Sequence, residues 1–184
     1  MVPVRSLFLS ICFAAMAFAA HAAPTRGDVA EPEALVVEVP LPVMLAAVTG
    51  WVAADLGEPI PDEMPAIVFM DRATMRAIRG SSGAQPSSDA ESETGVQALY
   101  LDDSRTVVLP TGWSGATAAQ VSMLVHEVVH HFQALRGDIH ACPAAREKLA
   151  YEVQERWLEA HGESLESAFG LSGMYLLVTT NCMF

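Results

Sequence analysis

The residues of this chain that are best suited to chemistry are two histidines and a glutamate in the segment 124–131, LVHEVVHH. His126 and His130 are four positions apart, which in an α-helix places both side chains on one face, one turn apart. Two imidazoles so placed can bind one Zn²⁺ at ~2.0–2.1 Å. Glu127 lies about 100° round the helix, where it can reach a water molecule on the metal. The pattern H-E-x-x-H therefore predicts a zinc site with a general base beside it.

A zinc site of this kind needs a third protein ligand, and the predicted helix 144–161 offers candidates. Glu152 shares a charged face with Lys148 and Arg156 at i,i+4 spacing, which is typical of a solvated helix surface. Glu147 shares its face with mostly uncharged residues: Tyr151, Gln154 and Leu158. That face can turn toward the histidine helix, so Glu147 is the predicted third ligand and Glu152 is the alternative.

These residues together resemble the zincin metallopeptidases, specifically the gluzincin branch, in which a glutamate on a helix downstream of H-E-x-x-H completes the site. The short separation is similar to that of the compact minigluzincins, and the resemblance covers roughly residues 96–161. Tyr151 stands where the family has an aspartate that orients a zinc histidine, so Tyr151 or Gln154 would take that role. Gln133 and Arg136 replace the glycine and histidine of the metzincin extension, which excludes that branch.

The resemblance implies a zinc-dependent peptidase in which one Zn²⁺ ion is held by His126, His130 and Glu147. Glu127 would be the catalytic residue that moves the proton of the attacking water, and the substrate would be a peptide or protein. Such a substrate would pair with an edge strand of the sheet, for which the segment 105–109 is the candidate; an ordinary hairpin strand is the equal alternative for this segment.

Two further roles stay open at the level of the sequence. A donor to the oxyanion is needed, and four residues are candidates: Tyr151, Tyr175, His140 and His161. His131 points away from the ligand face by helical geometry, so we expect a surface or packing histidine there.

The composition excludes several classes of partner. The chain has 184 residues, with 10 Lys and Arg against 22 Asp and Glu, and a formal net charge of −12. Nucleic acids and anionic lipid surfaces require clustered basic residues, so neither is an expected partner. Neutral or cationic partners are favoured, and we expect a monomer.

The first 23 residues have the features of a secretory signal peptide. Arg5 precedes an apolar stretch over 6–20, and small residues follow at 20–23. The apolar run is too short for a membrane-spanning helix. We therefore expect a single domain over 24–184 that is periplasmic or secreted, with no stable membrane insertion after signal removal.

The number and positions of the cysteines are consistent with an exported protein. Cys12 lies in the signal peptide, which leaves Cys142 and Cys182 in the mature chain. A pair of cysteines in an exported protein predicts one disulfide bond. Metal binding by Cys142 is the less favoured alternative.

The pattern of apolar segments predicts an α+β fold. Helices are expected over 42–56, 73–79, 116–135, 143–161 and 164–178, with a strand over 66–70 and a hairpin over 96–101 and 105–109. A polar loop is expected over 81–94. The resulting domain has a short mixed or antiparallel sheet packed on the H-E-x-x-H helix, followed by the helix with the third ligand.

Two other functions compete with the peptidase. One is a non-catalytic, zinc-containing periplasmic binding or structural protein, and the other is an exported protein without metal. Glu127 argues against the first, because structural zinc sites usually have four protein ligands and need no general base.

Overall fold

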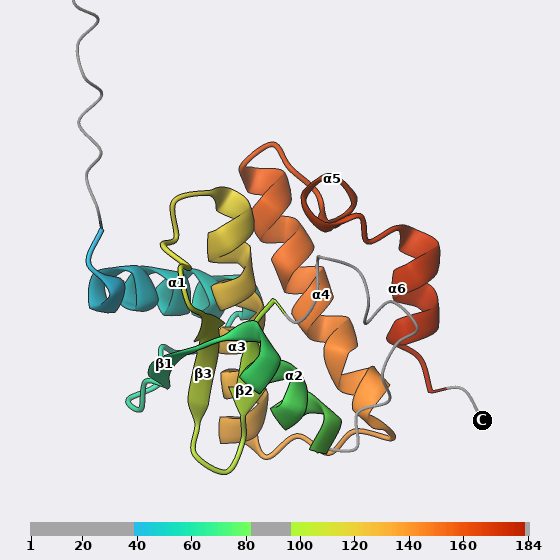
Figure 1. Ribbon diagram of the computed structural model, residues 1–184, viewed down its shortest axis with the longest axis horizontal. Helices are drawn as coiled ribbons and strands as arrows, with labels where there is room; N and C mark the ends of the chain where they lie inside the picture. Colours follow the sequence, from blue (N-terminus) through green and yellow to red (C-terminus); the bar gives the residue numbers. More distant parts are fainter. Residues whose placement is uncertain (1–38, 82–96, 183–184) are drawn as a thin grey trace, which may run out of the picture. The chain divides into compact units, whose positions relative to one another are not determined.

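The computed structural model describes residues 39–81 and 97–182, which belong to one compact unit. These residues form six helices and three strands, so the predicted α+β class is confirmed (Figure 1). The predicted signal peptide and most of the predicted polar loop lie outside the described residues. Within the described part of the chain, no helix is both long and apolar enough to cross a membrane.

Helix α1 spans Leu41–Leu56 and confirms the prediction from its end signals. Pro42 lies in the first turn, where a missing N–H costs nothing. Gly57 follows in the left-handed conformation, with φ of 69°, and its N–H caps the last turn. The helix buries Leu45, Val48 and Val52 in the main hydrophobic core.

The three strands form one mixed sheet in the order β1-β3-β2. Strand β3 (Thr106–Pro110) is central, with β1 (Ala66–Met70) parallel on one side and β2 (Leu99–Leu101) antiparallel on the other. The hairpin prediction is confirmed, but the segment 105–109 is not an edge strand as expected. Both of its edges are already paired, so it cannot add a substrate strand.

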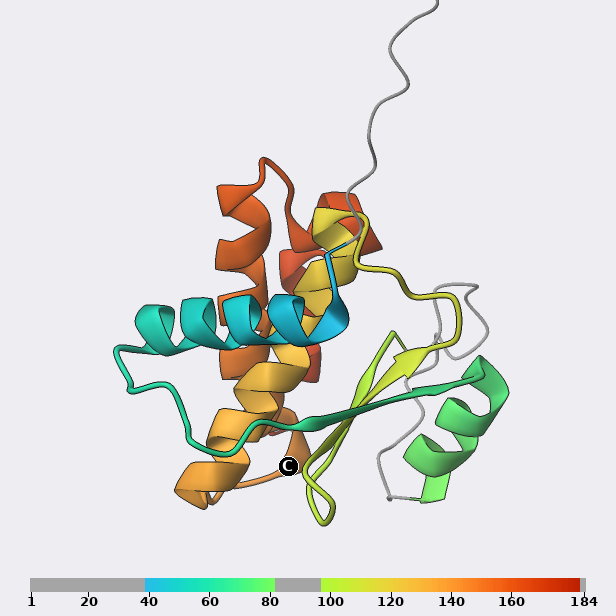
Figure 2. The same cartoon turned by 90° about the vertical axis from the view of Figure 1, so that its left-hand side faces the viewer.

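The central strand is buried on both faces of the sheet. Val107 and Leu109 belong to the main core, which α1, α3 and α4 also build. Val108 points to the opposite face and contacts Met75 of helix α2 (Arg72–Ser81). Figure 2 shows the sheet between α2 on one side and helices α1, α3 and α4 on the other. Strand β3 therefore joins the main core to the smaller one under α2.

Helices α3 (Ala118–Arg136) and α4 (Pro143–Ala160) lie side by side and carry the predicted site (Figure 1). The Thr117 side chain accepts a hydrogen bond from the Gln120 N–H and so caps the start of α3. Gly137 ends the helix with φ of 68°. Because α3 also contacts α1 and the sheet, its residues 122–133 are all buried.

The chain after α4 differs from the prediction of one helix over 164–178. It forms two short helices, α5 (Leu165–Phe169) and α6 (Gly173–Thr179), because Gly170 takes a left-handed conformation with φ of 71° and caps α5. The predicted disulfide is confirmed: Cys142 at the start of α4 is bonded to Cys182 after α6.

Candidate metal centre

The two histidines of the motif lie on one face of α3, and their rings meet at right angles. The ring centroids of His126 and His130 are 4.9 Å apart, with an interplanar angle of 78°. Only 8% of His126 and 5% of His130 are exposed. The four-residue spacing therefore produces the expected pair of imidazoles within a largely buried site.

Glu147 comes from the second turn of α4 and meets both imidazoles. Its Oε2 atom is 3.1 Å from His126 Nε2, and its Oε1 atom is 3.5 Å from His130 Nε2. The ligand atoms of the three residues lie within 4.8 Å of one another. Ligands at ~2.0–2.1 Å from a tetrahedral Zn²⁺ are separated by about 3.3 Å, which fits the two measured distances. The group could therefore hold a metal ion.

A buried glutamine sets the orientation of His126. Its Nδ1 atom lies 2.9 Å from Gln154 Oε1, and Gln154 Nε2 donates a 3.1 Å hydrogen bond to the hydroxyl of Ser122. That hydroxyl in turn donates to the carbonyl of Ala119, so it must accept from the glutamine. The amide oxygen therefore faces the imidazole, so Nδ1 donates to it and Nε2 is the nitrogen that faces Glu147.

A second glutamine does the same for His130. Gln133 Oε1 lies 2.7 Å from His130 Nδ1, while Gln133 Nε2 donates to the backbone carbonyl of Arg146. A carbonyl can only accept, so this amide orientation is also determined. Arg146 Nε lies 3.2 Å from the same Nδ1, but two protonated nitrogens cannot bond each other. The guanidinium instead pairs with the carboxylate of Asp102 at 2.6 and 2.8 Å.

Charges within the group act strongly on one another. Burial alone would raise the pKa of Glu147, but its contacts with both imidazoles outweigh burial and hold that pKa far below its usual range. Burial also opposes protonation of His126, yet the neighbouring carboxylates of Glu147 and Glu127 raise its pKa. An anionic glutamate facing two imidazole nitrogens is a donor set that suits a divalent cation.

Glu127 lies beside this group and is only 6% exposed. Burial raises the pKa of its carboxyl, and the imidazoles of His126 and His130 oppose that rise. A raised carboxyl pKa brings a glutamate closer to the range in which it can both take and return a proton. The residue is thus a buried carboxyl with a raised pKa, next to the possible metal ligands.

The structure also shows where the other candidate residues of the site lie relative to the metal group. Glu152, the alternative third ligand, is exposed and outside the group. Of the two residues expected to orient a metal-binding histidine, Gln154 contacts His126 Nδ1, whereas the Tyr151 ring packs edge-on against His126 with centroids 4.7 Å apart. Burial, with Glu147 nearby, raises the pKa of Tyr151 far above its usual range, so its hydroxyl remains a donor. His161 instead stacks on Trp157 beyond the end of α4.

His131 is a buried packing residue that carries its proton on Nε2, whereas His126 and His130 donate from Nδ1. Its Nε2 atom lies 2.7 Å from the backbone carbonyl of Glu63 and must donate to it. Its Nδ1 atom therefore accepts from the Tyr100 hydroxyl at 2.9 Å. Both ring nitrogens of His131 are occupied, which explains why this histidine, next to the motif on α3, stays out of the metal group.

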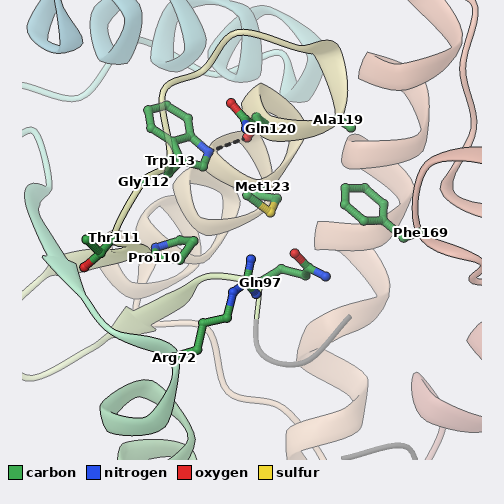
Figure 3. Close-up of a pocket in the computed structure, with 10 residues that line it drawn as sticks. All are labelled: Arg72, Gln97, Pro110, Thr111, Gly112, Trp113, Ala119, Gln120, Met123 and Phe169. Carbon is green, nitrogen blue, oxygen red and sulfur yellow. Dashed lines mark hydrogen bonds between the residues drawn. The ribbon is translucent and has the colours of Figure 1, made fainter. Parts of the chain in front are cut away.

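A cavity of about 210 Å³ lies one helical turn before His126. Figure 3 shows that Met123, which precedes His126 by three positions on α3, points into it, together with Phe169 of α5. The side chains of Arg72 and Gln97 border the cavity from the opposite side. The sequence does not predict this cavity, because it depends on contacts between five separate segments.

Comparison with known proteins adds a family but no activity. The model of one protein family matches residues 38–183, and its description is "Domain of unknown function (DUF6647)". No curated protein and no solved structure matches the chain.

Proposed function

The chain belongs to the DUF6647 family, and from its site we propose that it is an exported, zinc-dependent metallopeptidase similar to the gluzincins. One observation carries this proposal: two imidazole Nε2 atoms and one carboxylate converge, with a second, buried carboxylate beside them. The three converging residues are His126, His130 and Glu147. Three protein ligands leave one tetrahedral position open, which is the arrangement of a catalytic zinc site.

Zinc is the proposed ion because of the ligand types. Two neutral imidazoles and a single carboxylate suit Zn²⁺ better than the hard cations Mg²⁺ and Ca²⁺, which prefer oxygen ligands. The glutamines at Nδ1 of both histidines support this choice, since zinc-bound histidines commonly donate that second N–H to an oxygen. When bound, a zinc ion there would polarise the scissile carbonyl and lower the pKa of water.

Glu127 would perform the proton transfers. It takes a proton from the attacking water and passes it to the amine that leaves when the peptide C–N bond breaks. Its burial and its raised pKa support this role. Tyr151 would donate to the developing oxyanion; its hydroxyl stays protonated and its ring contacts His126.

Export is supported by the disulfide between Cys142 and Cys182, because such bonds persist in oxidising compartments. The expected signal peptide over 1–23 agrees with a periplasmic or secreted enzyme. Its substrate would then be a peptide or protein outside the cytoplasm.

The decisive experiment combines metal analysis with a peptidase assay. The purified protein should contain about one zinc ion per chain and cleave a mixture of unfolded proteins, and a chelator should abolish cleavage until zinc is restored. Glu127→Gln should keep the zinc and lose about 100-fold or more in rate. Glu152→Gln, on the exposed face of α4, is the matched control and should change neither. A protein with zinc but without cleavage would instead be a zinc-containing binding protein, and one without zinc would contradict the metal site.

A further inference from the structure

The start of helix α4 carries Glu147, but it lies outside the part of the helix that the hydrophobic core buries. The buried side chains of α4 begin at Ala150, three positions after Glu147. The disulfide at Cys142 joins this end of the helix to the chain after α6, rather than to α3. The position of Glu147 relative to the histidines of α3 therefore depends on polar contacts made by the first two turns of α4.

Arg146, the residue before Glu147, makes contacts of this kind in two directions. Its guanidinium donates two hydrogen bonds to the carboxylate of Asp102, at 2.6 and 2.8 Å. The guanidinium carbon also lies 5.9 Å from the centre of the Tyr100 ring, within the range of a cation–π contact. The backbone carbonyl of Arg146 accepts a 3.0 Å hydrogen bond from Gln133 Nε2. This one residue of α4 therefore contacts the β2–β3 hairpin with its side chain and α3 with its backbone.

The hairpin that carries Asp102 is itself fixed against α3. The hydroxyl of Tyr100, in strand β2, lies 2.9 Å from Nδ1 of His131, which adjoins the metal motif on α3. The turn between β2 and β3 is closed by the backbone N–H of Arg105, which donates to the Asp102 carbonyl at 3.2 Å. The hairpin is therefore an anchor next to the histidines, and Arg146 connects this anchor to the helix of the third ligand.

We propose that Asp102 and Arg146 are positioning residues of the metal centre: their ion pair holds the start of α4 where Glu147 can share one ion with the two histidines. This inference rests on the metal site of the proposed function and not on the cleavage step. Metal ligands must lie within about 0.2 Å of their usual distances, so a small shift of α4 affects zinc binding. The Arg146 and Asp102 side chains are 24% and 50% exposed, and a pair so exposed contributes little to the stability of the fold. Its main effect is therefore expected on the metal.

The opposite charges of the two residues separate positioning from simple electrostatics. Arg146 Nε lies 3.2 Å from His130 Nδ1, so Arg146→Gln removes a positive charge near the ion and would by charge alone strengthen zinc binding. Asp102→Asn removes a negative charge and would by charge alone weaken it. Loss of positioning lowers zinc affinity in both variants. We expect each to bind zinc about tenfold more weakly than the wild type, measured by competition with a chelator of known affinity.

Each variant has a matched control. Arg156→Gln removes another arginine of α4, which pairs with Asp55 of α1. Asp103→Asn removes the neighbouring charge of the same exposed turn. Both controls should change zinc affinity by less than about twofold, because exposed charges away from the ion are screened. A gain in zinc affinity for Arg146→Gln, or a loss in either control as large as in the matching variant, would overturn the inference.

A double substitution tests whether Arg146 acts through Glu147. In the Glu147→Ala background, Arg146→Gln should no longer lower zinc affinity, because the ligand that it positions is absent. Cobalt-substituted Arg146→Gln should have an altered visible absorption spectrum, whereas Arg156→Gln should keep that of the wild type. Urea denaturation with a chelator present should show that both variants fold with similar stability. An equal loss of zinc affinity with and without Glu147 would overturn the inference, since the arginine would then act through Gln133.

Zinc binding and cleavage together separate this inference from the proposed function. If the wild-type protein binds zinc and cleaves nothing, but Arg146→Gln and Asp102→Asn show the expected losses of affinity, the positioning role stands and the peptidase proposal fails. If the wild-type protein cleaves peptides and both variants bind zinc as tightly as it does, the inference fails alone. A wild-type protein that takes up no zinc would overturn both.

Discussion

The Nδ1 atom of His126 lies 2.9 Å from the Oε1 atom of Gln154, in the buried contact between α3 and α4. His130 has an equivalent contact of 2.7 Å with Gln133, one turn along its own helix. Both amides are fixed by their own donor bonds, so both imidazoles donate from Nδ1 and direct Nε2 toward Glu147. Neutral groups therefore set the ring orientation that metal binding needs.

Removal of either glutamine should weaken metal binding. Gln154→Leu and Gln133→Leu keep the approximate volume but remove the acceptor, so each should lower zinc affinity by ~10–100-fold. The measurement is competition for zinc with a chelator of known affinity. Gln154→Glu retains an acceptor and adds negative charge, so it should bind zinc at least as tightly as the wild type. Unchanged affinity in both leucine variants would contradict the role given to the amides.

The third ligand can be tested by a pair of substitutions on one helix. Glu147→Ala should lower zinc affinity by more than about 100-fold, because a direct ligand contributes more than the groups behind it. Glu152→Ala, on the exposed side of α4, should leave the affinity unchanged. A cobalt-substituted sample provides a second measurement, since the loss of one ligand should alter its visible absorption spectrum. If the two variants exchanged these results, Glu152 would be the ligand.

Local signals account for the part of the site that could be predicted from the sequence. The H-E-x-x-H spacing and the uncharged face of α4 were enough to bring His126, His130 and Glu147 forward as a group, and the structure brings them together. Glycine and proline positions likewise located α1 and the end of α3 within one or two residues. These features depend on neighbours a few positions apart, which a single sequence displays directly.

Features that depend on distant segments could not be predicted in the same way. The position of β3 at the centre of the sheet requires β1 to pair with it in parallel, across the intervening helix α2, and no local pattern reports that pairing. Gln133 was visible three positions after His130, but its role depends on the backbone of Arg146 in α4.

The hydrogen bond between Tyr100 and His131 should stabilise the fold without affecting the metal. Burial raises the pKa of Tyr100 to about 12, so its hydroxyl stays protonated and donates to His131 Nδ1. Tyr100→Phe leaves that buried nitrogen unsatisfied, because Nε2 must still donate to Glu63. We expect the free energy of unfolding to fall by ~1–3 kcal/mol, measured by urea denaturation, with zinc affinity unchanged. A loss of zinc affinity as large as that of Gln154→Leu would place His131 in the metal site instead.

The disulfide should stabilise the domain by closing a long loop around α4. Cys142 and Cys182 are separated by 40 positions, for which the loss of unfolded-chain entropy is worth about 3–4 kcal/mol. The double substitution of Cys142→Ser with Cys182→Ser should lower the free energy of unfolding by roughly that amount, measured by urea denaturation in the presence of zinc. Reduction of the wild-type protein is the matched control and should give the same decrease. Since Glu147 follows Cys142 by five positions on a helix that also packs on α3, zinc should still bind after the bond is lost. Equal stability of the oxidised and reduced proteins would contradict this role for the bond.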